Sequence, residues 1–427
     1  MCILPEITPI DLPDLRRRND PWFYPRRLLW FLFFVSHPLP QVNAGCKIAC
    51  TKKKGWPYLG TSTDKRGMTP QKWFNMTGTS SPATPRWRAR SRIPPAWLAA
   101  AAILSVALWL GAEFATRHPV HPRYAEMLNA ARAMEAASRV LVAERQMRGL
   151  MQGREIDPNR TGMIGSEFTA ITTTLGDLAA KRTTANPDFA AALVRAVATL
   201  DLPRGTPVVI IVSGSFVGGD IAAMTAAEAL GLRPVVIASL SASMWGATDP
   251  EFNWLDMAAA LRARGVIRAR IAAAVLGGDG AVGGGMDAAG VAALRASAAR
   301  DGVPLIEARP LAALIDALLG QVNTSIADAK RDETRPGAVI NVGGALIGLG
   351  SCREAYELPP GLATRSPSCT AGTPGLAMRL AQAGVPLLHV LNIRRLAVEW
   401  GLPLDPVPLP VPGNNAAIYG SVRRNGA

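Results

Sequence analysis

Two serines and a lysine in the middle of the chain have side chains that could carry out nucleophilic catalysis. Ser213 and Ser215 follow the apolar run TPVVIIV, where a strand would turn into a helix. A serine nucleophile needs a nearby base, and Lys181, one of only two lysines after residue 75, could supply it. We therefore predict Ser213, Ser215 and Lys181 as candidate catalytic residues, although VSGSF is not the G-x-S-x-G elbow.

The stretch SLSASMWGATDPEFNWLDM follows the next apolar run and offers a second set of polar side chains. A serine between Ser239 and Ser243 could be the nucleophile instead. Pro250 suits the first position of a helix with Asp249 as its N-cap. Asp249 and Glu251 are then explained by their place at the helix N-terminus and need no catalytic role. Trp254 is expected to pack inward. The stretch is predicted to form a binding lip through Ser239, Ser241, Ser243, Trp245, Thr248 and Asp249.

Two further loops have a composition that suits ligand binding. They contribute Gly278, Asp279, Gly280, Asn341, Gly343 and Gly344. Loops at the carboxyl ends of parallel strands gather at one edge of the sheet, where hydroxyls, backbone N–H groups and helix N-termini would favour carboxylates. The alternative is that small polar residues simply make tight turns and caps.

Several motifs do not support the specific chemistry that they first suggest. The match of GDGAVG to G-x-G-x-x-G is better explained as a flexible glycine loop, because the glycines run on to Gly285. His389 lies in an apolar strand and is predicted to be a core histidine. Thr172 to Asp177 fits a helix cap, with a self-released threonine nucleophile as the alternative. No metal ligand cluster and no cofactor are predicted.

Apolar runs of strand length alternate with helical segments from residue 186 onward. The predicted strands are TPVVIIV, RPVVIA, ARIAAAVL, VPLIEA, GAVINV and VPLLHVL, and the predicted helices are 220–230, 250–264, 287–300, 310–330 and 373–383. This alternation is typical of a parallel sheet covered on both faces. The predicted fold class is therefore α/β, with a mostly parallel, doubly wound sheet in residues 186–403 and a Pro-rich tail in 404–427.

The positive charge of the chain lies in its N-terminal part. Of the net +14, residues 1–75 supply +7, residues 76–123 supply +5 and the remainder only +2. A nucleic-acid partner is therefore not expected. The composition of residues 1–75 suggests a misplaced start codon, with Met76 as the true start, and the alternative is a real basic leader.

Residues 96–115 form an apolar segment of the length that spans a bilayer. Arginines crowd the preceding residues 76–95, so the positive-inside rule places the N-terminus in the cytoplasm. An uncleaved signal anchor is favoured over a cleaved signal peptide, because no clear A-x-A site follows. We predict a single-pass protein of the cell (inner) membrane, with an amphipathic helical stalk and connection in 122–185 and an extracytoplasmic main domain.

Cys352 and Cys369 are the two cysteines of the predicted outer portion. An oxidising compartment would allow them to pair, and the closed loop would contribute about 3 kcal/mol in the chain-entropy model. Two unrelated thiols are the alternative, since spacing does not establish connectivity.

Four segments of the chain resemble a known family. These are IGSEFTAITTTLGDLAAKRTTANPDFAA, VSGSF, LSASMWGATDPEFNWLDM and GGDGAVGGGM, and they are similar to the poly-gamma-glutamate system protein family. The resemblance covers roughly residues 86–419. It implies a membrane-anchored component of bacterial poly-γ-glutamate (capsule) synthesis and export, with the polymer, the lipid bilayer and the membrane subunits of the synthetase or exporter as partners.

The resemblance supplies no catalytic assignment, so two functions stay open. The first, which we favour at this point, is a non-catalytic accessory protein that binds the polymer or its export complex. The second is a serine-dependent hydrolase or transferase acting on γ-glutamyl bonds.

Overall fold

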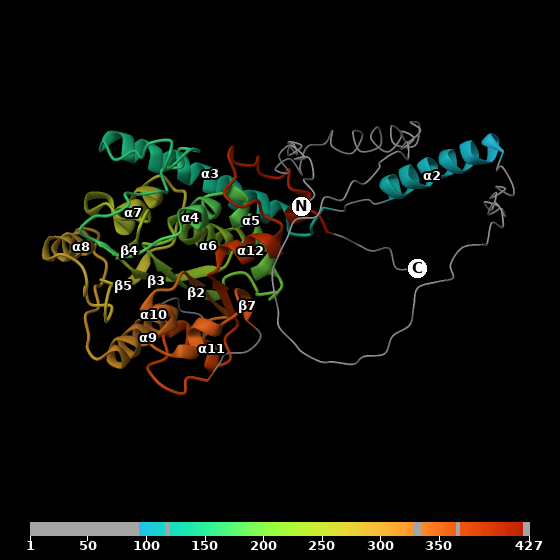
Figure 1. Cartoon of the computed structure of the whole chain (residues 1–427). Coiled ribbons are helices and arrows are strands. Elements are labelled where there is room, and N and C mark those ends of the chain that lie inside the picture. The colour runs from blue at the N-terminus through green and yellow to red at the C-terminus, as the bar shows by residue number, and fades with distance from the viewer. Residues whose placement is uncertain (1–93, 116–119, 328–334, 364–367, 422–427) are drawn as a thin grey trace, which may run out of the picture. The chain divides into compact units, whose positions relative to one another are not determined.

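The computed structural model describes residues 94–115, 120–327, 335–363 and 368–421 (Figure 1). Contacts divide the chain into two units, Met1–Arg90 and Ser91–Ala427. The predicted leader and most of the basic segment after it lie outside the described residues. Helix α2 (Pro95–Ala115) covers the predicted anchor segment. Among the described residues, no helix combines the length and the apolar character that crossing a membrane requires.

A six-stranded sheet forms the centre of the main domain. The order across it is β5-β3-β2-β6-β8-β7, and only the edge strand β7 runs antiparallel to its neighbour. The strands are β2 (Pro207–Ser213), β3 (Arg233–Ser239), β5 (Ile271–Val275), β6 (Ala338–Val342), β7 (Gly361–Ala363) and β8 (Leu387–Val390). The predicted α/β class with a mostly parallel sheet is confirmed.

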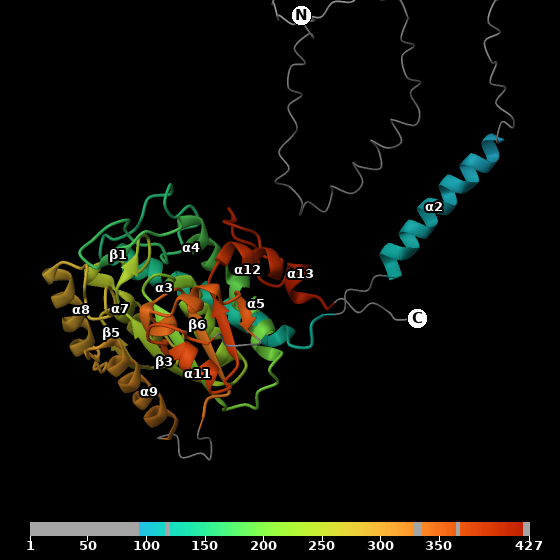
Figure 2. The same ribbon diagram turned by 60° about the horizontal axis from the view of Figure 1, so that its bottom comes forward.

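Helices cover both faces of this sheet, because successive strand residues point to opposite sides. Val208, Ile210 and Val212 pack into one core with α3, α5, α6, α7 and α8, whereas Val209 and Ile211 pack into a second core with α9, α10 and α11. Figure 1 shows the two layers on either side of the strands, and Figure 2 brings α9 and α11 forward.

The helices of the main domain have the following bounds. They are α3 (Tyr124–Met147), α4 (Leu178–Thr184), α5 (Pro187–Ala198), α6 (Val217–Ala229), α7 (Trp254–Ala263), α8 (Ala288–Arg300), α9 (Leu311–Ala327), α10 (Leu346–Leu349), α11 (Leu376–Gln382), α12 (Ile393–Trp400) and α13 (Ala416–Tyr419). The Pro-rich tail is mostly irregular, as its composition predicts.

The helix predicted from Pro250 starts four residues later. Pro250–Phe252 forms one turn of 3₁₀ helix, and α7 begins at Trp254 because Asn253 and Asp256 form a reciprocal capping box. The predicted N-cap, Asp249, makes no side-chain cap bond. Trp254 is fully buried, as predicted.

Other elements also differ from the sequence-based expectation. The segment VPLIEA, predicted as a strand, forms only an isolated bridge between Leu305 and Ala274 of β5. A small second sheet pairs β1 (Thr172–Thr174) in parallel with β4 (Ala242–Ser243). Strands of two or three residues leave no periodic pattern in a sequence, so this sheet was not predictable.

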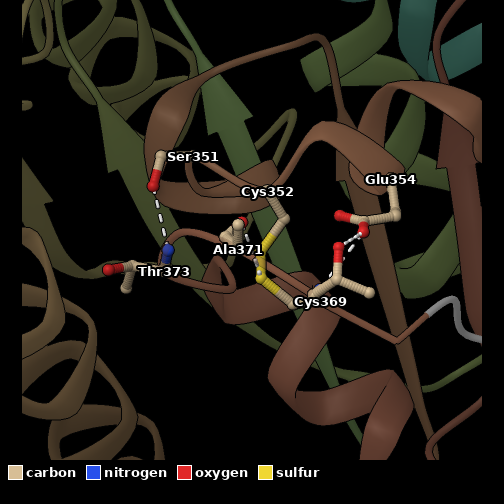
Figure 3. Close-up of a disulfide and its surroundings, with 7 residues drawn as sticks. Ser351, Cys352, Glu354, Cys369, Ala371 and Thr373 are labelled. Atoms are coloured by element: carbon tan, nitrogen blue, oxygen red, sulfur yellow. Dashed lines mark hydrogen bonds between the residues drawn. A yellow bond between two sulfur atoms is a disulfide. The ribbon is translucent and has the colours of Figure 1, made fainter.

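Cys352 and Cys369 form a disulfide with a Cα–Cα distance of 5.5 Å (Figure 3). The same two chain segments are joined by hydrogen bonds from Ser351 N to Thr373 O and from Thr373 N to Ser351 Oγ, both 2.9 Å. The disulfide therefore fastens the chain around the short 3₁₀ helix Arg353–Glu357.

Candidate active site

A polar cleft of about 430 Å³ lies at the carboxyl ends of the parallel strands. From β2 the chain proceeds through β3 to β5 and then returns to β6, on the other side of β2. The strand order therefore reverses between β2 and β6, which is where ligands bind in open α/β sheets. The loops after β2, β3, β5 and β6 all contribute to the cleft wall.

Lys181 is buried behind this wall with only 3% of its surface exposed. It lies on α4, whose N-terminus is capped by Asp177 through a 3.2 Å hydrogen bond from Ala180 N. Its Nζ donates to the Ser215 carbonyl oxygen, lies 2.8 Å from Ser243 Oγ and sits 4.8 Å from the centre of the Phe216 ring. All three neighbours are uncharged.

Burial lowers the pKa of Lys181 from 10.5 to about 7. Asp220, a fully buried residue of α6, and Asp177 oppose this shift. Burial raises the pKa of Asp220 itself well above its ordinary value. Much of Lys181 is therefore a free amine near neutral pH, as a general base must be.

Ser243 is the hydroxyl that this amine reaches. It ends β4, and the pairing of β4 with β1 fixes its backbone. A Cβ at Gly176 would lie 2.5 Å from the Met244 carbonyl oxygen and 3.0 Å from Lys181 Cε, so only glycine lets the segment before α4 approach this closely. The chain then turns at Trp245, which has a φ of +61°.

Ser215 supports the pair from the loop after β2. Its carbonyl oxygen accepts from Lys181, and its Oγ accepts from Ser243 N at 3.0 Å. Ser215 and Ser243 both line the cleft. The nucleophile–base geometry thus belongs to Ser243 and Lys181, with Ser215 as the residue that holds both of them.

The remaining serines of the two loops also face the cleft. Ser213, Ser239 and Ser241 line it. Ser241 Oγ accepts from Gly278 N at 2.9 Å and from Thr173 Oγ1 at 3.4 Å. Ser213 Oγ is buried and has no hydrogen-bond partner in the described part of the chain.

The glycine loop after β5 lines the cleft through Gly278, Asp279 and Gly280. Its N–H groups are largely used within the loop, since Asp279 N donates to Gly284 O and Gly283 N donates to Gly277 O. A dinucleotide-binding loop must instead aim such donors at a phosphate. The loop therefore closes on itself and does not form a phosphate cradle.

Three residues predicted for the binding lip lie elsewhere. Asp249 pairs with the buried Arg145 at 2.6 Å and accepts from Ser166 Oγ. Thr248 Oγ1 donates to Ser166 O at 2.7 Å. Trp245 is half-buried beside the same segment and donates its backbone N–H to Ser166 O. The lip is thus restricted to the three serines, because the following residues tie the loop to the connection after α3.

The predicted residues of the loop after β6 also differ in whether they line the cleft. Gly344 lines the cleft, while Asn341 is fully buried and donates to Gly343 O at 2.9 Å. Asn341 Nδ2 also lies 3.2 Å from His389 Nδ1. Burial lowers the pKa of His389 to about 4, which keeps this core histidine neutral.

The cleft also has residues that the sequence analysis did not predict, and the large ones are Leu175, Phe216, Leu346 and Tyr356. Apolar side chains in loops give no chemical signal of their own. Thr173 and Thr174 also line the cleft, next to the TTTLGD segment whose Asp177 caps α4. In the described part of the chain, no group of His, Cys, Asp and Glu could hold a metal ion.

Comparisons with protein-family models, with curated proteins and with solved structures find no match for this chain.

Proposed function

We propose that the protein is a serine–lysine acyl-transfer enzyme, a hydrolase or transferase of amides or esters. The observation that carries this proposal is the 2.8 Å contact between Lys181 Nζ and Ser243 Oγ at the wall of the switch-point cleft. A buried lysine without a carboxylate partner is costly to the fold. A buried amine held against a cleft-lining hydroxyl has the arrangement of an activated nucleophile.

The geometry suggests a simple sequence of proton transfers. The neutral amine of Lys181 accepts the Ser243 Oγ proton while Oγ forms a bond to the substrate carbonyl carbon. The resulting ammonium then returns that proton to the leaving nitrogen or oxygen as the carbonyl–heteroatom bond breaks, leaving an acyl-serine. Water or another acceptor attacks the acyl-serine by the same route.

Ser215 would keep the base oriented through each step. The Ser215 carbonyl oxygen holds one N–H of Lys181, and its hydroxyl holds the backbone of Ser243. The ammonium formed during the reaction would lie 4.8 Å from the centre of the Phe216 ring, whose face favours a cation. A pKa of about 7 for Lys181 suits both directions of proton transfer at neutral pH.

The family resemblance supports γ-glutamyl amides as the substrate and a place in a membrane-associated poly-γ-glutamate system. Under this proposal the polymer or a fragment of it enters the cleft. An accessory protein that binds the polymer without cutting it is the competing function, and it remains one outcome of the experiment below.

The test is covalent labelling of the full chain with a fluorophosphonate probe, followed by peptide mapping. Activated serines react with such probes, so we expect one label on Ser243 and none in Ser243→Ala. Ser325→Ala, which removes a hydroxyl on α9 that donates to Gln321 O, is the matched control and keeps the label.

Poly-γ-glutamate is then incubated with the same three proteins and its chain length followed. Shortening by the wild type and the control, but not by Ser243→Ala, would support the γ-glutamyl substrate. Binding of the polymer with neither labelling nor shortening would overturn the enzymatic proposal in favour of the accessory role.

A further inference from the structure

Ser213 has an unsatisfied hydroxyl beside the proposed dyad. It ends β2, is only 2% exposed and lines the cleft, yet its Oγ has no hydrogen-bond partner in the described part of the chain. A Cβ at Gly343 would lie 3.0 Å from this oxygen, so the glycine leaves the space in front of it open. A buried hydroxyl without a partner costs free energy unless a ligand supplies the missing bond.

The N-terminus of α6 reaches the same end of the cleft. This helix has 13 residues, and its N-cap residue, Phe216, lines the cleft and makes no side-chain cap bond. Its first turn therefore has N–H groups without a side-chain cap, and the helix dipole gives this end a partial positive charge. The only acid in that turn is Asp220, and burial raises its pKa well above the ordinary value.

Charge is distributed unevenly along the cleft. Asp279, the one acid among the lining residues of the described chain, follows β5, two strands away from β2. No lysine or arginine is among those lining residues. One hydroxyl and one helix terminus can compensate a single negative charge better than the double charge of a phosphate, which usually recruits Arg or Lys.

We propose that Ser213 and the first turn of α6 form a subsite for one carboxylate, so that the substrates are amides or esters whose acyl part ends in a carboxylate. The subsite deepens the proposed function and rests on it. The carboxylate accepts from Ser213 Oγ, the α6 terminus stabilises its charge, and the scissile carbonyl is then held at Ser243. The acyl chain joins these two points across the loop that follows β2.

The test uses the full chain and p-nitrophenyl monoesters of succinic, glutaric and adipic acid. Each is paired with the neutral ester in which the distal carboxylate is a carboxamide. The wild type should prefer at least one acid over its amide by about 10-fold or more in kcat/KM, the range expected for a hydrogen bond to a charged group. Ser213→Ala should reduce this ratio about 10-fold, whereas Thr324→Ala, an exposed hydroxyl on α9, should leave it unchanged.

A binding measurement separates this subsite from the catalytic proposal. Calorimetry with Ser243→Ala should detect the free diacid of the preferred length, weaker binding of its monoamide, and loss of that difference in Ser213→Ala/Ser243→Ala. Turnover of all esters without acid preference would overturn the subsite and keep the enzyme. Binding of the diacid without any turnover would overturn the enzyme and keep the subsite. Tighter binding of inorganic phosphate than of the diacids would overturn the assignment to a carboxylate.

Discussion

Two buried cations in this domain have opposite surroundings. Arg145, fully buried at the end of α3, donates to Gly162 O at 2.7 Å, to Leu150 O at 3.2 Å and to Asp249 Oδ2 at 2.6 Å. Lys181 has two uncharged oxygens and an aromatic ring. The arginine is paired with the carboxylate of Asp249, whereas burial lowers the pKa of the lysine to about 7.

This difference gives the two residues different roles, since Arg145 stabilises the fold and Lys181 can take part in a reaction. The Arg145–Asp249 pair joins α3 to the loop after β4, and Phe252 packs 5.6 Å from the guanidinium. Arginine cannot release its proton in a protein, so this pair can only hold segments together. Lys181 lies behind a cleft and can exchange its proton at neutral pH, which makes it a candidate for reaction.

The largest expected effect comes from removing the amine. Lys181→Met should slow phosphonylation of Ser243 by about 10⁴-fold or more, the loss typical of disabling a nucleophile–base pair. Lys181→Arg should not restore the rate, because a guanidinium remains protonated. Initial labelling rates, with circular dichroism as the check on folding, measure both. If either folded variant were labelled at the wild-type rate, Lys181 would have only a structural role.

A smaller effect is expected from breaking the structural pair. Asp249→Asn leaves Arg145 buried without a counter-charge and should lower the free energy of unfolding by about 3–5 kcal/mol. Urea denaturation measures the change. The matched control is Asp316→Asn, because Asp316 forms an ion pair with Arg379 at the surface and is 63% exposed; it should cost at most about 1 kcal/mol. Equal losses in the two variants would remove the contrast between the two cations.

The smallest effect is a gradual one, the pH dependence of the wild type. Since the base must be deprotonated, the labelling rate should rise about tenfold per unit as pH increases towards the Lys181 pKa of about 7 and level off above it. Labelling reactions quenched at fixed times between pH 5 and 9 give the pH–rate profile. A rate that still rises about tenfold per unit at pH 9, as the ordinary lysine pKa of 10.5 would give, would mean that the burial of Lys181 does not tune its chemistry.

The sequence by itself determined the framework of the molecule. Continuous apolar runs such as PVVIIV can only be buried on both faces, so they predict the parallel sheet and, with it, the edge at which serine and glycine loops meet. Composition also singled out Lys181, because lysine is rare in this part of the chain. Ser213 and Ser215 were predicted to face the site because they follow an apolar strand, at the carboxyl edge of the sheet, and both line the cleft.

Only the tertiary structure decided which serine meets the lysine. Lys181 and Ser243 are 62 residues apart, and the two short strands that bring Ser243 into reach have no periodicity to read. The role of Asp249 also depends on the tertiary structure, since its ion-pair partner Arg145 lies 104 residues away in the sequence. Local sequence patterns determine helices and strands, because the apolar periodicity of these elements spans only a few residues. A contact between two side chains far apart in the sequence depends on the packed core that holds both in place.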